Sequence, residues 1–188
     1  MKPSRTTNQI RIIGGTHRGR RIEFPDLPGL RPTGDRIRET LFNWLQPILP
    51  GAACLDLFAG SGALGLEAAS RGAGRVVFLE QAPQAAAHIR KAISLLRLAN
   101  VEVQQVDTIT WLDRPGVPFH ILFLDPPFAD ARYGEVCRLL HERGWLAPQA
   151  RIYIEADKAL DLGALPEGWD CVREKTTGQV AYRLFVAP

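Results

Sequence analysis

The chain has 188 residues, enough for one well-filled α/β core and short for two. Hydrophobic residues make up 46% of it and charged residues 23%, and no apolar run reaches the length that would cross a bilayer, which excludes a membrane-spanning helix. The net charge is +3, yet the first 38 residues hold nine basic and three acidic side chains, a net charge of +6; this asymmetry indicates a polyanionic partner, unless the basic residues merely solvate a terminus.

The N-terminal segment predicts a basic hairpin. It has no apolar region of the secretory type, so we expect a cytoplasmic protein. Residues 10–24 (IRIIGGTHRGRRIEF) predict two short strands around a Gly- and Arg-rich bend, too small to be stable unless they dock on the main body. We therefore predict a basic arm over residues 1–30 and a single globular domain over residues 31–188. The candidate nucleic-acid contacts are the arginines in and after this arm: Arg11, Arg18, Arg20, Arg21, Arg31 and Arg36.

A helix is predicted after the proline-rich loop that follows the hairpin. Thr33 or Asp35 can cap its N-terminus, although Gly34 stands where a small polar residue would be expected. Apolar residues recur at helical spacing and predict a buried stripe of Ile37, Leu41, Trp44 and Leu45. Arg36 and Glu39 lie off that stripe and are free to face a ligand or the hairpin.

The decapeptide DLFAGSGALG, residues 56–65, predicts a strand, a glycine turn and a helix start. Such a turn gathers backbone N–H groups and the positive end of a helix at one point, where a nucleotide-like ligand can bind. Its glycines match G-x-G-x-x-G, which favours a dinucleotide, but Asp56 would repel a pyrophosphate and attract an ammonium group. S-adenosylmethionine, a cationic nucleoside with an amino-acid amine, therefore fits better than a dinucleotide. An ordinary tight turn is the alternative.

The rest of the chain alternates strands with helices and ends in a hairpin. The expected strands are residues 75–80, 101–106, 119–124 and 152–155, and the expected helices are residues 83–98 and 133–143. This order predicts a parallel sheet covered on both faces, with ligands at the carboxyl ends of its strands. Residues 169–175 and 180–186 are separated by TTGQ and predict an antiparallel hairpin at the sheet edge. The fold class is therefore α/β, compatible with the Rossmann-like class I methyltransferase plan.

The tetrapeptide Asp125-Pro126-Pro127-Phe128 follows a predicted core strand, on the same rim as the glycine turn. Two prolines stiffen the loop and remove two N–H donors. The Asp125 carboxylate and the Pro126 carbonyl can accept both hydrogens of an exocyclic aryl amine, while Phe128 stacks on its base. These hydrogen bonds favour a nucleophilic amine positioned for attack on a sulfonium methyl. We assign catalysis to Asp125, Pro126, Pro127 and Phe128; a plain turn is the alternative.

Acidic strand ends complete the predicted site. Glu80 can accept the ribose hydroxyls of a nucleoside, and Asp107 can contact the adenine amine, although either can be a surface acid. The candidate cofactor contacts are Asp56, Phe58, Gly60, Ser61, Gly62, Glu80, Gln81, Asp107 and Thr108. The histidines show no metal-ligand spacing, and the three cysteines, Cys54, Cys137 and Cys171, are expected as reduced thiols in the core. No metal is predicted.

The motifs together resemble a known family. IRIIGGTHRGRRI, RPTGDRIRETLFNWL, CLDLFAGSGALGLEA, FLDPPF and TGQVAYRLF are similar to segments of the RsmD-type small-subunit ribosomal RNA guanine-N2 methyltransferases, from about residue 10 to the end. The resemblance implies methyl transfer from S-adenosylmethionine to N2 of one guanine in 16S RNA, within a small-subunit particle. It implies that Asp56, Gly60 and Glu80 hold the cofactor, residues 125–128 the guanine, and the hairpin arginines the RNA.

Other functions stay open at this point. A DNA adenine-N6 methyltransferase is the nearest alternative, but a chain of 188 residues leaves little room for a separate target-recognition domain. A protein-glutamine methyltransferase would use a similar loop, and the basic arm counts against it. A non-catalytic RNA-binding assembly factor would not need an intact Asp125. We expect a monomer.

Overall fold

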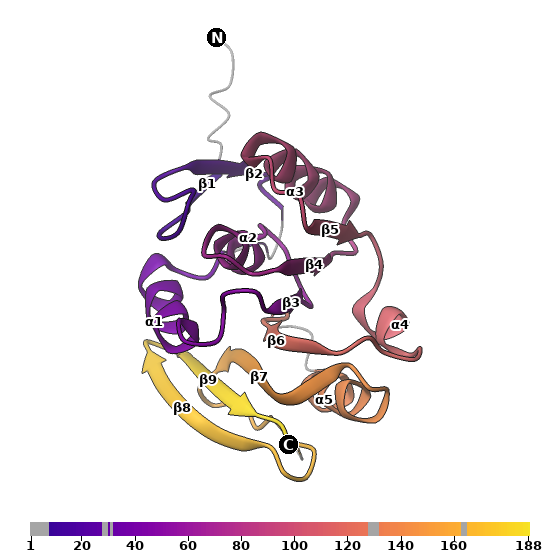
Figure 1. Cartoon of the computed structure of the whole chain (residues 1–188). Coiled ribbons are helices and arrows are strands. Elements are labelled where there is room, and N and C mark those ends of the chain that lie inside the picture. The colour runs from indigo at the N-terminus through magenta and orange to yellow at the C-terminus, as the bar shows by residue number, and fades with distance from the viewer. Residues whose placement is uncertain (1–7, 28–29, 31, 128–131, 163–164) are drawn as a thin grey trace.

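The structure is a computed structural model that describes residues 8–27, 30, 32–127, 132–162 and 165–188. Its main sheet has seven strands in the order β5-β4-β3-β6-β7-β9-β8, and a second sheet pairs β1 with β2 (Figure 1). The strands are β1 Asn8–Arg11, β2 Arg21–Phe24, β3 Ala53–Asp56, β4 Arg75–Leu79, β5 Val101–Gln104, β6 Phe119–Leu124, β7 Leu146–Asp157, β8 Asp170–Thr177 and β9 Val180–Val186. The helices are α1 Asp35–Leu45, α2 Ala63–Ser70, α3 Pro83–Leu96, α4 Thr108–Leu112 and α5 Tyr133–Glu142.

The sheet confirms the predicted α/β class. Strands β3 to β7 pair in parallel, β9 runs antiparallel to β7, and β8 closes the edge antiparallel to β9. Crossover connections join the parallel strands, so the carboxyl ends of β3, β4 and β6 lie on one rim. The predicted strands at residues 119–124 and 180–186 agree with the structure, whereas β7 is much longer than residues 152–155.

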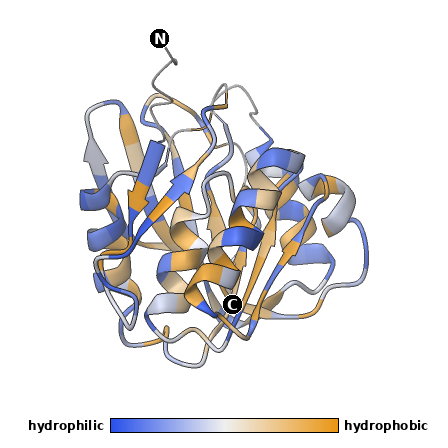
Figure 2. Cartoon of the chain, turned by 90° about the horizontal axis from the view of Figure 1, so that it is seen from above, coloured by the Kyte–Doolittle hydropathy of each residue, from blue (hydrophilic) through white to orange (hydrophobic). Residues whose placement is uncertain are grey.

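The strand residues alternate between two cores, one on each face of the sheet. Cys54 and Phe123 pack with α1, α2, α3 and the β1–β2 hairpin, while their neighbours Leu55 and Leu122 pack with α4 and α5. Figure 2 shows hydrophobic residues gathered on the central strands, and Figure 1 shows α1 and α2 on one side of the sheet and α4 and α5 on the other. A side-chain period of two therefore decides which face each strand-end residue meets.

The basic hairpin forms as predicted and docks on the body. Strands β1 and β2 pair antiparallel, and their inward residues Ile10, Ile22 and Phe24 are buried in the same core as α1 and α2. This shared core supplies the support that a two-stranded hairpin lacks by itself.

Three local predictions were wrong. Neither Thr33 nor Asp35 caps α1, because Gly34 is the N-cap, the Thr33 side chain turns to Asp125, and Asp35 lies inside the first turn. Trp44 is only half-buried and stacks on Tyr182 with ring centroids 5.6 Å apart, whereas Phe42 is fully buried. Cys171 is exposed because it lies on the edge strand β8, all of whose residues are exposed; Cys54 and Cys137 are buried as expected.

Candidate functional site

The glycine turn has the predicted strand–turn–helix form. After β3 the chain turns through Gly60 and Gly62, whose φ angles of 53° and 78° lie in the left-handed region, and α2 begins at Ala63. Residues with a Cβ rarely adopt these angles, so glycine is required at both positions. The turn is held by the Ala59 N–H, which donates to the Leu79 carbonyl of β4 at 3.0 Å.

Gly65, the third glycine of the motif, serves helix–sheet packing. A Cβ at this position would lie 2.2 Å from the ring of Phe78, which is fully buried in β4. The absence of a side chain lets the first turn of α2 lie directly on the sheet. This close packing fixes the direction in which the N-terminus of α2 points.

Asp56 ends β3 beneath the turn and is buried, at 3% exposure. Its Oδ2 accepts a hydrogen bond from the Gly65 N–H at 3.0 Å, so the carboxyl group ties β3 to the first turn of α2. Burial raises the pKa of Asp56 to about 7, and Glu80 contributes to this rise although the Gly65 N–H opposes it. The predicted pairing of Asp56 with an ammonium group stays a prediction, and the turn-stabilising role was not foreseen.

Glu80 follows β4 and braces the same turn. Its Oε2 accepts from the Gly60 N–H and its Oε1 from the Ala82 N–H, both at 2.7 Å. The side chain is partly exposed, and each carboxylate oxygen has a second lone pair, so the predicted acceptance of ribose hydroxyls is compatible with these bonds. Gln81 beside it is exposed.

The next strand end carries Asp107 and Thr108. Asp107 caps α4 by accepting from the Thr110 N–H at 3.0 Å, which lowers its pKa, and it pairs with Arg132 at 3.5 Å. The Thr108 hydroxyl is buried and donates to the Leu57 carbonyl at 2.5 Å. Both residues therefore support the backbone beside the glycine turn, and their contacts with a cofactor stay predictions. Within the same turn Phe58 is partly exposed and Ser61 is buried.

The two predicted corners lie on the same rim, side by side. Strands β3 and β6 are neighbours, with Asp56 in register with Phe123, and the Leu57 N–H donates to the Phe123 carbonyl at 3.0 Å. Asp125 comes two residues after Phe123 and is partly exposed; Pro126 is buried and Pro127 is exposed. Phe128 lies outside the described residues.

Sequence reasoning missed three residues that surround Asp125. Thr33 donates from Oγ1 to Asp125 Oδ2 at 3.1 Å. Glu155 extends from β7 at the same level, because Leu124 is in register with Ile154, and its Oε2 accepts from the Tyr153 hydroxyl at 2.7 Å. The usable signal was alternation, since Asp125 and Glu155 each continue the parity of the strand residues that face α1 and α2.

Burial and like charge set the protonation of this corner. Burial raises the pKa of Asp125 well above its usual value, and the neighbouring Glu155 and Asp56 raise it further. Burial likewise raises the pKa of Glu155, which the hydroxyls of Tyr153 and Thr33 partly counteract. Because the two carboxyl groups interact, Asp125 and Glu155 do not ionise independently. Together they therefore hold a proton at a pH at which an exposed carboxyl group would have lost it.

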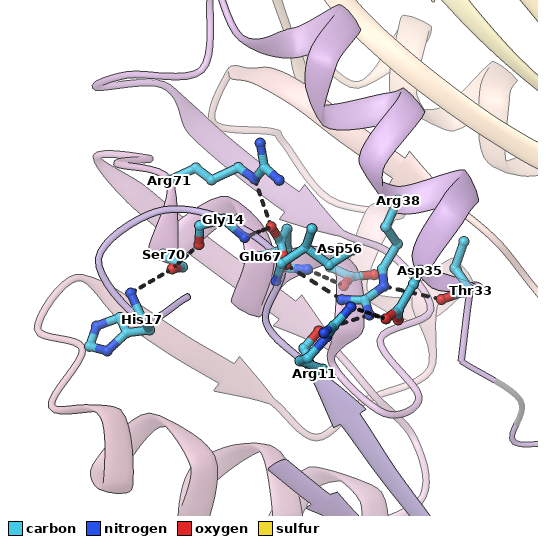
Figure 3. Close-up of polar contacts among 12 residues, drawn as sticks. Arg11, Gly14, His17, Thr33, Asp35, Arg38, Asp56, Glu67, Ser70 and Arg71 are labelled. Atoms are coloured by element: carbon cyan, nitrogen blue, oxygen red, sulfur yellow. Dashed lines mark hydrogen bonds and ion pairs between the residues drawn. The ribbon is translucent and has the colours of Figure 1, made fainter. Parts of the chain in front are cut away.

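The predicted nucleic-acid contacts gather on and beside the hairpin. Their exposed members are Arg11, Arg18, Arg20, Arg21 and Arg36, while Arg31 lies outside the described residues. Glu67 of α2 anchors the hairpin bend, because its two oxygens accept from the N–H groups of Ile13 and Gly14 at 2.8 Å each (Figure 3). The basic surface is therefore held rigidly against the helix that starts at the glycine turn.

The described residues form neither a metal centre nor a membrane-spanning helix. No group of three or more His, Cys, Asp or Glu side chains in that part of the chain is arranged to hold a metal ion. None of the helices described is long and apolar enough to cross a membrane. A shallow hollow of about 520 Å³ lies at the opposite rim, where β4 and β5 begin, far from the acidic corner.

Comparisons with known proteins identify the family. The family model described as Conserved hypothetical protein 95 matches residues 10–186. Ribosomal RNA small subunit methyltransferase D of Escherichia coli K12 is 47% identical over 185 residues, which cover 98% of this chain and 93% of that protein. The protein of the same name from Haemophilus influenzae is 43% identical over 192 residues, covering 98% and 99%.

Solved structures agree with this assignment. The Escherichia coli protein yhhF superposes with a TM-score of 0.90 at 44% identity, covering 96% of this chain and 98% of that one. An RNA methyltransferase from Salinibacter ruber, solved with S-adenosyl-L-homocysteine, has a TM-score of 0.66 at 18% identity, covering 84% and 94%, and shows the shared fold. This chain therefore has the class I methyltransferase fold and belongs to the ribosomal RNA small subunit methyltransferase D family.

Proposed function

We propose that this protein transfers a methyl group from S-adenosylmethionine to the N2 amine of one guanine in 16S ribosomal RNA. Relatives named ribosomal RNA small subunit methyltransferase D support the RNA class. The single observation that carries the proposal is the adjacency of the glycine turn and the Asp125-Pro126 corner at the ends of two neighbouring parallel strands. That adjacency suits direct transfer between a donor in one corner and an amine in the other.

The glycine turn fits S-adenosylmethionine. A Cβ at Gly60 would lie 3.2 Å from the Leu30 side chain, and a residue bearing it would have to adopt a positive φ. The open shape of the turn therefore depends on glycine. The turn and its neighbours supply Asp56 for an ammonium group and Glu80 for ribose hydroxyls. When bound, S-adenosylmethionine supplies an electrophilic methyl group on a sulfonium.

The chain's own residues then hold and deprotonate the amine. Asp125 accepts one N–H of the amine and the Pro126 carbonyl accepts the other, which orients the nitrogen lone pair. The raised pKa of Asp125 makes its carboxylate a stronger base than a surface acid, so it suits removal of the proton that the nitrogen sheds after methylation. No covalent bond to the protein is required.

The experiment that tests the chemistry uses Asp125→Ala. Labelled cofactor is incubated with small subunits, naked 16S RNA and DNA, and the products are digested to nucleosides. We expect N2-methylguanosine from wild type, a loss of at least about 100-fold in Asp125→Ala, and unchanged cofactor affinity. Asp113→Ala, which removes only an exposed partner of Arg143, is the matched control. Label in N6-methyladenine, or turnover retained by Asp125→Ala, would refute the proposal.

The same assay decides the remaining parts. Label on subunits but not on naked RNA would support a particle as substrate. Folded wild type that binds RNA yet transfers no methyl to any of these substrates would favour the assembly-factor alternative. A monomer and a cytoplasmic location complete the proposal and are measurable by sedimentation and by fractionation.

RNA binding is tested separately through the hairpin. Replacing Arg18, Arg20 and Arg21 by Ala should weaken RNA binding and reduce the magnitude of the negative slope of log affinity against log salt by about one for each lost phosphate contact. Arg138, exposed on α5 and paired with Glu142, provides a control substitution distant in sequence from the arm. An unchanged slope would make the hairpin a purely structural element.

A further inference from the structure

Thr33 is a buried hydroxyl-bearing residue that joins α1 to the acidic corner. It is 6% exposed, directly precedes Gly34, and donates from Oγ1 to Asp125 Oδ2 at 3.1 Å. A hydroxyl has one hydrogen to donate, and Thr33 donates it to Oδ2. This bond orients the Asp125 carboxylate so that Oδ1 is the oxygen that does not face Thr33.

The backbone of Thr33 is held by a buried guanidinium. Arg38, at 1% exposure, donates from Nε to the Thr33 carbonyl at 3.1 Å and from Nη2 to the Arg11 carbonyl of β1 at 2.9 Å (Figure 3). The same guanidinium pairs with Asp35 at 2.5 Å and with Glu67 at 3.5 Å. Arg38 therefore ties Thr33 to the hairpin on one side and to α2 on the other.

We propose that Thr33 is a positioning residue whose hydroxyl orients the Asp125 carboxylate, and that Arg38 links this orientation to the docked basic hairpin. The inference rests on the proposed function, because Asp125 is the group that it serves. A fixed Asp125 carboxylate has fewer orientations to lose when it accepts a hydrogen bond from the reacting amine, which lowers the entropic cost of reaching the reactive geometry.

The electrostatics of the corner give this hydroxyl a measurable effect. The titratable groups facing Asp125 are Asp56 from β3 and Tyr153 and Glu155 from β7, with Tyr182 of β9 behind Tyr153. Against the acids and burial, which raise the pKa of Asp125, the Thr33 hydroxyl lowers it, and it lowers the pKa of Glu155 as well. Removing the hydroxyl should therefore keep the Asp125–Glu155 pair protonated up to a higher pH. Over that added pH range Asp125 would no longer be the ionised acceptor for the amine.

The test compares Thr33→Val, which removes the hydroxyl at nearly constant shape, with Thr33→Ser, which keeps it. Thr40→Val is the control, because the Thr40 hydroxyl donates only to the Arg36 carbonyl within α1. For Thr33→Val we expect kcat at neutral pH to fall about tenfold, KM to stay within about twofold, and the acidic limb of the pH profile to move to higher pH. Thr33→Ser should restore both.

A second readout does not depend on turnover. Carbon-13 titration of the side-chain carboxyl groups should show the Asp125–Glu155 pair titrating at higher pH in Thr33→Val than in wild type and Thr33→Ser. If Thr33→Val fails to fold, Thr33→Ala gives a second hydroxyl-free variant for both measurements.

The outcomes separate the inference from the function that it rests on. An unchanged titration and pH profile in the hydroxyl-free variants, or a change in KM alone, would overturn the role of Thr33 while leaving methyl transfer intact. A wild-type protein that transfers no methyl would refute the proposed function, and the titration would still decide whether the hydroxyl controls the carboxyl pair.

Discussion

Glu67→Gln tests the buried network that holds the hairpin on the body. Glu67 is fully buried, and its carboxylate accepts two backbone N–H bonds of 2.8 Å, a 2.6 Å bond from Arg71 Nε and a 3.5 Å contact from Arg38. Glutamine keeps one acceptor oxygen and places an NH2 group among donors, leaving the buried Arg38 undercompensated. Breaking a buried ion pair from one side costs about 3–5 kcal/mol, so we expect a loss of that size in the free energy of unfolding.

The assay is urea unfolding at neutral pH, followed by tryptophan fluorescence and by amide exchange of the hairpin. Glu102→Gln is the matched control, because its ion pair with Arg75 is about half-exposed on both sides and should contribute less than about 1 kcal/mol. Since a domain of this size has a total stability of about 5–15 kcal/mol, the hairpin amides should exchange faster even where the body stays folded. A Glu67→Gln variant within about 1 kcal/mol of wild type would refute this account of the network.

Three further predictions concern packing, pH and thiols. Gly65→Ala should lower the free energy of unfolding by about 1–3 kcal/mol, because the added Cβ would clash with Phe78. Gly134→Ala in α5, where a Cβ would meet open space, is the control and should be neutral or stabilising by up to about 1 kcal/mol. Equal melting temperatures of the two variants would contradict this prediction. Asp56 has a pKa raised from 3.8 to about 7, so its contribution to stability is present below the unfolded pKa and lost as pH rises through about 7. Relative to wild type, Asp56→Asn should therefore gain up to about 4 kcal/mol in the free energy of unfolding between about pH 4 and pH 8. Parallel plots of this free energy against pH for the two proteins would refute the prediction. Cys171 should react with a thiol reagent in the folded protein, and the two buried cysteines only after unfolding; three fast thiols at the outset would be inconsistent with the fold.

The elements that sequence predicted well are those whose signal is local. The glycine turn needs positive φ angles at Gly60 and Gly62, and the hairpin strands alternate around a Gly-rich bend, so the residue types themselves specify the backbone. Adjacent parallel strands then bring Asp125 beside the turn. For these reasons the rim and its two corners could be predicted without coordinates.

The parts that sequence missed depend on contacts across long separations. Thr33 reads as a helix cap by its local pattern, but a partner 92 residues away takes its hydroxyl. The sequence offers no local sign that Arg38 is buried, and its burial depends on Glu67 and three carbonyl or carboxylate groups that converge on it. Glu155 ended a predicted strand, and alternation gives its face of the sheet, but its register with the residues of β6 is needed to place it at the acidic corner.

Helix α2 joins the two halves of the proposed function in one rigid element. Its N-terminus is the glycine turn, and its third turn carries Ser70, whose Oγ donates to the Gly14 carbonyl at 2.6 Å and accepts from the His17 N–H at 3.0 Å. The hairpin also shares its hydrophobic core with this helix. The predicted boundary at residue 30 therefore separates two segments of the sequence that share one hydrophobic core. Because the hairpin cannot leave without exposing Ile10 and Ile22 and breaking these bonds, the proposed RNA contacts on its arginines would stay at a fixed position relative to the proposed cofactor turn, as direct methyl transfer requires.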